Sequence, residues 1–318
     1  MPRVLCALLA APLLLALAVA PASATPPDNL DSLRQAALQA VNQDRQEAGL
    51  EPLSLTDGLN QAAQTHADDM AERGYFAHEA PNGDTVADRY RDAGGSRWEL
   101  VEENIARCGT CSAPPDEAEV DGLERGWMDS PEHRRNILAH GLTGFGFGIA
   151  VDSEDGLYAV QTFAGPGEPR GLSQGERSEQ LDAQAARELA LELVNEVRAG
   201  AGSQPLALSE DLSEAAARLL PEDATGGLQI AGDPFQALPA DARGAWARLS
   251  LLAAACGGCG VGRTAADIRS FVRQWEGNAG TTGRLAEAGL THAGFAMAAD
   301  GEGRKTALIV LGSRRGGD

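Results

Sequence analysis

The residues best suited to chemistry in this 318-residue chain are its cysteines, four of which form two similar motifs. CGTC occupies residues 108–111 and CGGC occupies residues 256–259. Two C-x-x-C pairs are compatible with a shared four-cysteine zinc site, a redox centre or two local disulfides. Zinc-binding pairs within one unit usually lie about 15–20 residues apart, whereas these motifs are 148 residues apart.

The surroundings of the two motifs favour disulfides. Each pair follows a predicted extended segment, at Ile105-Ala106 and at Ala253-Ala254, and leads into a loop rich in Gly, Pro or Ser. A thioredoxin-like centre would instead place its first cysteine at a helix N-terminus in a βαβ setting. We therefore predict the bonds Cys108–Cys111 and Cys256–Cys259, although closing so short a loop removes little chain entropy. A shared metal and a redox role remain the alternatives.

The N-terminus predicts export. Arg3 precedes an apolar run from Val4 to Val19, and Ala22-Ser23-Ala24 fits a signal-peptidase site. We therefore predict a signal peptide over residues 1–24, with a membrane anchor as the alternative. No second run of about 18 apolar residues follows. The mature protein is expected to be secreted or periplasmic, where cysteines oxidise.

The net charge limits the partners. The chain carries a formal charge of −20 at pH 7. Nucleic acids and anionic membrane surfaces both require a basic face, so neither is expected as a partner. The acidity itself is typical of a well-solvated surface.

The chain repeats itself. Residues 37–59 and 190–212 agree at an offset of 153, sharing an Asn, an Arg and a Gly at positions 42, 45 and 49 of the first copy. Farther along, the offset is 148 and pairs Trp127 with Trp275 and each cysteine with its counterpart. This pattern predicts a tandem duplication, with domains at residues 25–164 and 181–318. Residues 165–180, rich in Gly, Pro, Ser and charge, are predicted to be a linker.

Periodicity within the first copy predicts helices and a hairpin. Apolar residues at helical spacing end at Gly49, a second helix runs from Thr56-Asp57 to Gly74, and a third covers Val120 to Trp127. Residues 144–164 alternate as a β-hairpin that turns at 153–156. Each copy is therefore expected to be an α+β domain, with helices packed on a small antiparallel sheet.

Histidines occur in ordered strings of the first copy. GYFAHEAPNG surrounds His78, VEENIAR contains Glu103, and GWMDSPEHRRNIL contains His133. His66, on the second predicted helix, is expected to be packed or capping, and His140 to be exposed. With the opening N-x-x-R-x-x-x-G-L-x-P-L, these strings resemble the CAP superfamily of cysteine-rich secretory, antigen 5 and pathogenesis-related 1 proteins. The similarity is greatest to its bacterial SCP-like extracellular branch and covers about residues 33–163.

The resemblance implies two α-β-α sandwiches, the first with a polar cleft. The residues matched to that cleft are His78, Glu103, Asn104, Ser130 and His133. Ser130 stands where the eukaryotic pattern has a second Glu, and neither Asp129 nor Glu132 can be assigned to that role from sequence.

Two imidazoles and one carboxylate allow two kinds of chemistry. His78, Glu103 and His133 are compatible with a divalent metal such as zinc, whose bound water would become a nucleophile. Without metal, Glu103 would orient both rings by hydrogen bonds. H-E-x-x-H and G-x-S-x-G are both absent, so neither a zincin helix nor a nucleophile elbow is indicated.

The second copy lacks this polar set. Leu251, Leu252 and Thr281 replace Glu103, Asn104 and His133, and His292 corresponds to Gly144. We expect a degenerate domain without a metal site.

These observations favour a secreted, non-enzymatic binding module for an extracellular lipid, peptide or cell-envelope component. The alternatives are a metal-dependent hydrolase acting on peptide or cell-wall material through His78, Glu103 and His133, and a structural or adhesive envelope protein.

Overall fold

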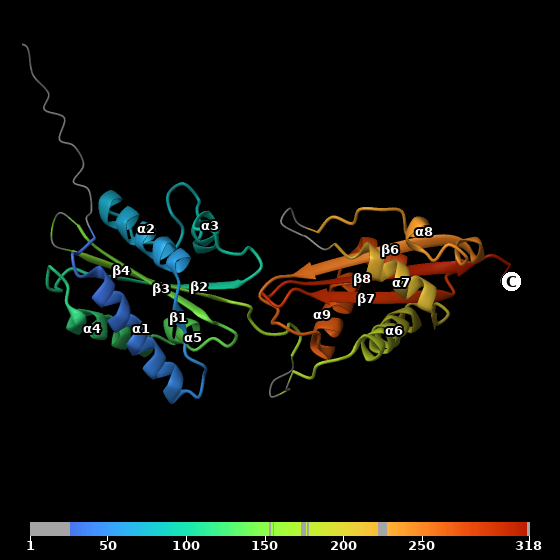
Figure 1. The fold of residues 1–318 in the computed structure, drawn as a ribbon, viewed down its shortest axis with the longest axis horizontal. Helices are drawn as coiled ribbons and strands as arrows, with labels where there is room; N and C mark the ends of the chain where they lie inside the picture. Colours follow the sequence, from blue (N-terminus) through green and yellow to red (C-terminus); the bar gives the residue numbers. More distant parts are fainter. Residues whose placement is uncertain are drawn as a thin grey trace, which may run out of the picture.

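The structure is a computed structural model that describes residues 26–152, 154, 156–172, 176, 178–221 and 228–316. The predicted signal peptide lies outside these residues, as does part of the predicted linker. Two sheet-bearing halves lie end to end along the long axis of the molecule (Figure 1). Within the described residues, no helix is both long enough and apolar enough to traverse a bilayer.

The first half is an α-β-α sandwich around one four-stranded sheet. Its strands are β1 (Ser54–Leu55), β2 (Leu100–Cys108), β3 (Gly144–Val151) and β4 (Leu157–Gly165), in the order β1-β3-β4-β2. Only β1 and β3 pair in parallel. The helices are α1 (Leu30–Glu47), α2 (Asp57–Arg73), α3 (Val86–Asp92), α4 (Glu117–Asp129) and α5 (Pro131–Ile137). Figure 1 shows α2 and α3 on one side of the sheet and α1, α4 and α5 on the other.

Each face of the sheet has its own apolar core. Leu33 and Val41 of α1 pack with Trp127 of α4 and with Phe145 and Phe147 of β3 on one face. On the other, α2 contributes Ala63, Ala67 and Met70 against Tyr158 and Val160 of β4. The alternation of β-strand side chains thus divides the predicted hairpin between two layers.

The predicted elements of the first half are confirmed, and short ones are added. The side chain of Thr56 caps α2 by accepting from the backbone N–H of Leu59, and Gly74 ends the helix with φ 66°. The hairpin is β3–β4. Helices α3 and α5 have seven residues each and β1 has two, too few for a period to show in the sequence.

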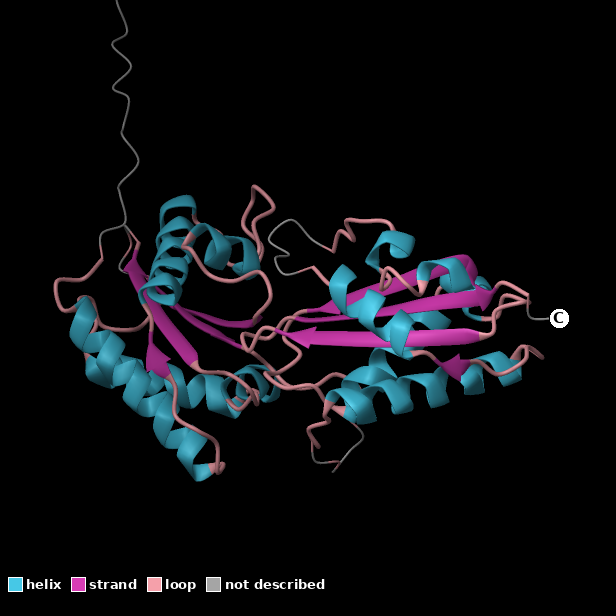
Figure 2. Cartoon of the chain, turned by 45° about the vertical axis from the view of Figure 1, so that its right-hand side comes forward, coloured by secondary structure: helices cyan, strands magenta, loops and turns pink. Residues whose placement is uncertain are grey.

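The second half has the same strand order. Its elements are α6 (Ala183–Gly200), β5 (Ala207–Leu208), α7 (Glu210–Leu219), α8 (Pro234–Ala237), β6 (Trp246–Cys256), α9 (Ala265–Glu276), α10 (Ala279–Leu285), β7 (His292–Ala299) and β8 (Lys305–Arg314), with a 3-10 turn at Arg243–Ala245. The sheet runs β5-β7-β8-β6, and Figure 2 shows helices flanking the strands of both halves. Ser54 pairs with Gly144, and Ala207 pairs with His292. Ser54 and Ala207 are 153 residues apart and Gly144 and His292 are 148 apart, so the pairings agree with both offsets of the sequence repeat.

One glycine in each half lets a helix pack closely on the sheet. A Cβ on Gly146 of β3 would lie 2.1 Å from the backbone carbon of Leu59 in α2. A Cβ on Gly294 of β7 would lie 2.1 Å from the backbone nitrogen of Ser213 in α7. No side chain can occupy either position unless the helix moves away.

A buried arginine anchors the first helix of each half. Arg45 donates to the carbonyls of Glu51, Ile137 and Ala139 at 3.0, 2.7 and 2.9 Å. Arg198 donates to the equivalent carbonyls of Gln204, Leu285 and Glu287. Both arginines are 1 % exposed. Their guanidinium groups therefore hold the end of the first helix against two later loops.

Both predicted disulfides are present. Cys108 is bonded to Cys111 and Cys256 to Cys259. Each bond follows the end of a long strand, β2 or β6, where the sequence places the extended segments.

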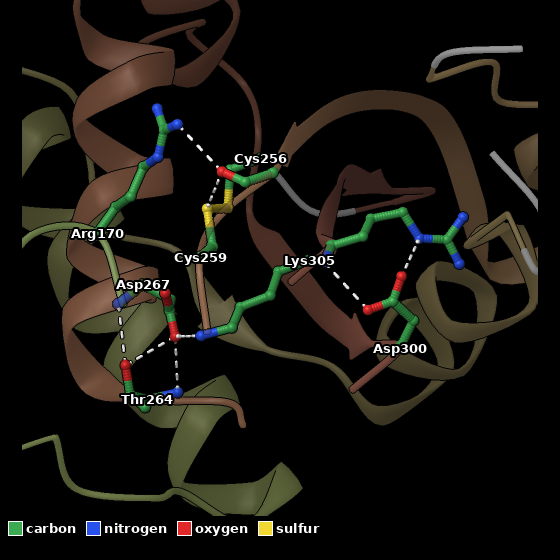
Figure 3. Close-up of a disulfide and its surroundings, with 9 residues drawn as sticks. Arg170, Cys256, Cys259, Thr264, Asp267, Asp300 and Lys305 are labelled. Carbon is green, nitrogen blue, oxygen red and sulfur yellow. Dashed lines mark hydrogen bonds and ion pairs between the residues drawn. A yellow bond between two sulfur atoms is a disulfide. The ribbon is translucent and has the colours of Figure 1, made fainter. Parts of the chain in front are cut away.

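The CGGC loop also joins the two halves. The N–H groups of Gly258 and Gly260 donate to the carbonyls of Trp98 and Pro166 at 2.6 and 2.7 Å. Arg170, in the predicted linker, donates to the carbonyl of Gly257 at 3.1 Å, and Figure 3 shows this contact beside the disulfide. The described part of the predicted linker therefore packs against the second half rather than standing free.

We expect Gly146→Ala to lower the free energy of unfolding of the first half by at least about 2 kcal/mol, because its Cβ meets helix backbone. Gly126→Ala is the matched control. Gly126 lies within α4, where a Cβ would meet no atom within 4 Å, so alanine there should stabilise by about 0.5–1 kcal/mol. Urea titration followed by circular dichroism measures both, and equal effects of the two substitutions would contradict the close-approach argument.

Candidate functional site

Three different elements carry the residues matched to the polar cleft. His78 lies in the loop between α2 and α3, Glu103 and Asn104 are neighbours on β2, and His133 lies on α5. Glu103 and Asn104 face opposite sides of the sheet because successive strand residues alternate. The sheet register places Glu103 opposite Thr162 and Asn104 opposite Gln161 on β4.

Glu103 is the centre of a buried charge cluster. It is 5 % exposed. Its Oε2 accepts a hydrogen bond from Nη2 of Arg89 on α3 at 2.7 Å, and its Oε1 lies 2.9 Å from Nδ1 of His78. Nε2 of His66 is 3.9 Å from the same Oε1. A buried carboxylate needs such partners, because an unpaired charge in the interior is costly.

This contact selects one tautomer of His78. Because a carboxylate oxygen can only accept, Nδ1 must carry the proton that Glu103 receives. In the neutral ring, Nε2 then has a free lone pair. The His78 side chain is 57 % exposed. The cluster therefore presents an oriented hydrogen-bond acceptor to solvent.

Arg89 and His66 hold the loop that carries His78. A second hydrogen bond of Arg89 reaches the backbone carbonyl of His78 at 3.1 Å, and another reaches that of Asp84 at 3.0 Å. His66 is fully buried and lies 2.9 Å from the carbonyl of Ala77. Burial lowers the pKa of His66. Its predicted packed role is confirmed, and His140 is exposed as expected.

Asparagine side chains hold the second histidine. Nδ2 of Asn104 donates to the backbone carbonyl of His133 at 3.2 Å, and Nδ2 of Asn136 donates to the carbonyl of Glu103 and to Oδ1 of Asn104, each at 3.0 Å. Burial lowers the pKa of His133, and the charge of His78 lowers it further.

The remaining candidates make no comparable contacts. Ser130 joins α4 to α5, and its side chain makes no helix-capping hydrogen bond. Asp129 and Glu132 are exposed. The structure therefore gives no carboxylate for the position that Ser130 occupies.

Glu103 is poorly placed to bind a metal ion. A guanidinium group and an imidazole N–H engage its two oxygens. Among the described residues, no group of three or more His, Cys, Asp or Glu side chains is arranged to hold a metal. The hydrogen-bonded brace accounts for these contacts, whereas a zinc site that includes Glu103 would require the carboxylate to leave Arg89.

Sequence reasoning missed Arg89, Asn136 and Gln161. A cation near Glu103 could have been expected, because a carboxylate in a buried strand needs a partner of opposite charge. The sequence offers many arginines, and only the tertiary fold selects the one on α3. Asn136 stood within the quoted string around His133, and Gln161 faces Asn104 across the sheet.

An α-β-α sandwich with a histidine-carboxylate cluster is the architecture expected of an SCP-like domain, and comparisons with known proteins agree. Residues 38–163 match the model of the cysteine-rich secretory protein (CAP) family. The uncharacterised protein YkwD of Bacillus subtilis (strain 168) is 30 % identical over 139 residues, which are 44 % of this chain and 49 % of YkwD. The chain therefore spans about half the length of this curated relative. Over residues 38–163, the first half is therefore similar to the CAP family.

Solved structures also resemble this chain. One is an extracellular protein containing an SCP domain from Bacillus anthracis, with 27 % identity, a TM-score of 0.35 and coverage of 42 % of this chain and 40 % of that one. Another is an outer surface protein from Borrelia burgdorferi, with 16 % identity, a TM-score of 0.38 and coverage of 45 % and 98 %.

We expect Glu103→Gln to destabilise the first half by about 3–5 kcal/mol, because Arg89 would remain buried without its counter-charge. Replacing both partners, as in Glu103→Leu with Arg89→Met, should recover most of that loss. Removing the exposed pair of Arg248 and Glu287 in the second half should cost less than about 1 kcal/mol. Chemical denaturation tests all three, and a double variant no more stable than Glu103→Gln would contradict the ion-pair argument.

His133 should titrate below its ordinary pKa of 6.5. In His78→Gln its pKa should rise but stay below 6.5, because burial is the larger cause. Since the folded state resists protonation of His133, this group's contribution to stability is present above pH 6.5 and lost as the pH falls below it. Histidine ring signals in NMR titrations measure both proteins. A value unchanged by His78→Gln would show that the rings do not interact.

Proposed function

We propose that this is a secreted SCP-like extracellular protein whose first half is a non-enzymatic binding module. The ligand site is the His/Glu cluster, defined as His78, Glu103 and His133. The observation that carries the proposal is the engagement of both Glu103 oxygens by Arg89 and His78. The carboxylate thus positions a histidine and leaves that ring's Nε2 free to accept a hydrogen bond.

The same geometry argues against the hydrolase alternative. A general base needs a proton acceptor within hydrogen-bond reach of the reacting group, but Glu103 is buried and already bonded. A metal-bound nucleophile needs ligands that are free to bind the metal. No specific contact in the described part of the first half favours hydrolysis over binding.

The exposed surface indicates the chemistry of the ligand. His78 offers a lone pair, and Phe76, two residues earlier in the same loop, is 47 % exposed. The site is therefore suited to a ligand that combines an O–H or N–H donor with apolar surface. Peptides, lipids and cell-envelope components all include such groups.

The second half is a degenerate CAP-like domain in this proposal. Support comes from its strand order, its arginine anchor and its glycine contact, all equivalent to those of the first half. Leu251 and Leu252 stand on β6 where β2 has Glu103 and Asn104. We assign it a supporting role, since the backbone N–H of Gly258 in its CGGC motif donates to the carbonyl of Trp98 in the first half.

Export is supported by the N-terminal sequence and the disulfides. Residues 1–24 have the charge, length and small-residue ending of a signal peptide. Both C-x-x-C pairs are disulfides, a state favoured outside the cytoplasm. Secretion of the processed chain, beginning near Thr25, would agree with this part of the proposal.

Binding at the His/Glu cluster can be tested by NMR with N-acetylated dipeptides and N-acetylated amino sugars as probes. We expect at least one probe class to shift the ring signals of His78 and His133 with millimolar affinity or better. His78→Ala should weaken this binding at least about tenfold, roughly 1.4 kcal/mol. His140→Ala, which removes an exposed histidine outside the cluster, is the matched control and should leave binding unchanged.

Catalysis is tested with the same probes over long incubation, with and without zinc. We expect the probes to remain intact. Zinc-dependent cleavage that disappears in both His78→Ala and His133→Ala would establish the hydrolase instead. Probe binding that survives both substitutions would move the function away from the cluster.

A further inference from the structure

A second group of acidic residues lies on the side of the first half formed by α1 and α4. A groove of about 290 Å³ there is lined by Asp44, Asp121, Glu124 and Arg125, with Ala40, Gln43 and Met128 completing its wall. The His/Glu cluster does not include any of these residues.

Glu124 is the unusual member of this acidic group. It is 4 % exposed, and its buried Oε1 has no hydrogen-bond donor. Asp44 of α1 lines the same groove as Glu124 of α4, and each of the two carboxyl groups affects the pKa of the other. Two neighbouring carboxylates in a partly buried site cannot both be ionised cheaply, whereas one proton shared between them would form an O–H···O hydrogen bond and give Oε1 a partner.

A directed chain of hydrogen bonds leads from Glu124 through the protein. Gln161 on β4 donates to Oε2 of Glu124 at 2.5 Å, and Asn104 on β2 donates to Oε1 of Gln161 at 3.0 Å. Asn136 on α5 donates to Oδ1 of Asn104, while Asn104 also donates to the carbonyl of His133. Each amide in the chain donates one hydrogen bond in the direction of Glu124, so a charge there polarises all of them.

The second half shows that the fold does not need this chain. Val197 and Val272 occupy the positions of Asp44 and Glu124, and they line the corresponding groove between α6 and α9. Leu252 and Ile309 pair across β6 and β8 where Asn104 and Gln161 pair across β2 and β4. All four positions are apolar in the half that also lacks the His/Glu cluster. The half with the His/Glu cluster therefore has the polar chain, and the half without the cluster forms the same fold without it.

From this arrangement we infer that Asp44 and Glu124 share a proton, and that losing it alters the α5 segment carrying His133 through Gln161 and Asn104. The chain is thus a proton-controlled link between the α1–α4 groove and the His/Glu cluster. Only its consequence for ligand affinity rests on the proposed function; the link itself does not.

The charges around the pair set the direction of the effect. Burial raises the pKa of Glu124 to about 8, and the neighbouring carboxylates of Asp44 and Asp121 contribute. Burial also raises the pKa of Asp44. The interaction with Glu124 and the charge of Arg134 lower this pKa, whereas the charge of Glu47 raises it. Arg125 also faces the groove. Since the folded state holds the proton more tightly than the unfolded chain, stability should fall as the pH rises from about 4.5 through 8.

The test follows the side-chain amide NMR signals of Gln161 and Asn104 in the full chain between pH 5 and 10. We expect both amides to shift with one common inflection near pH 8. Glu124→Gln should abolish that inflection. So should the double variant Asp44→Val with Glu124→Val, which copies the second half and should also unfold at a higher temperature above pH 8.

Asp121→Asn is the matched control in the same groove. It removes one neighbouring charge without breaking the chain, so the inflection should move to lower pH and persist. An inflection that survives the double valine variant would overturn the shared proton. A Gln161 signal that titrates while Asn104 and the His133 carbonyl stay constant would overturn the link. Neither outcome depends on whether a ligand binds the His/Glu cluster.

Discussion

The first half depends on how it compensates the charge of Glu103 inside the protein. A carboxylate on β2 at 5 % exposure would be prohibitive without a cation, and Arg89 supplies one from α3. Because Arg89 also bonds the carbonyls of His78 and Asp84, the same guanidinium fixes the loop that presents His78. Charge compensation and positioning of the site are therefore one interaction, made by one side chain.

The frame around that interaction could be predicted from the sequence because it repeats. Helix periods, the Thr56 and Gly74 caps, the β3–β4 hairpin and both disulfides follow from local pattern. The repeat also marked an arginine at positions 45 and 198, and both prove to be buried anchors. The sequence could not reveal which carbonyls they bind, because two of the three in each half lie about 90 residues away.

The polar interior was harder to predict for a physical reason. Asp44 and Glu124 each lie in an amphipathic helix, where a carboxylate normally indicates the solvated face. Only the packing of α1 against α4 buries Glu124 and places it in one groove with Asp44, which is half-buried. The resemblance identified His78, Glu103 and His133 but gave no information on Arg89, whose role depends on a contact across 14 residues of sequence. Residue type alone does not encode such pairings.

The two halves together form an internal comparison that separates folding from function. Both keep the arginine anchor, the glycine contact and the strand order. Where the first half has Glu103, Asn104, Glu124 and Gln161, the second has Leu251, Leu252, Val272 and Ile309. Apolar side chains at these positions are compatible with the same sheet and the same helices, and they avoid the desolvation cost of buried polar groups. The first half accepts that cost at every one of these positions, so the polar set is best explained by what it does at the His/Glu cluster rather than by the stability of the fold.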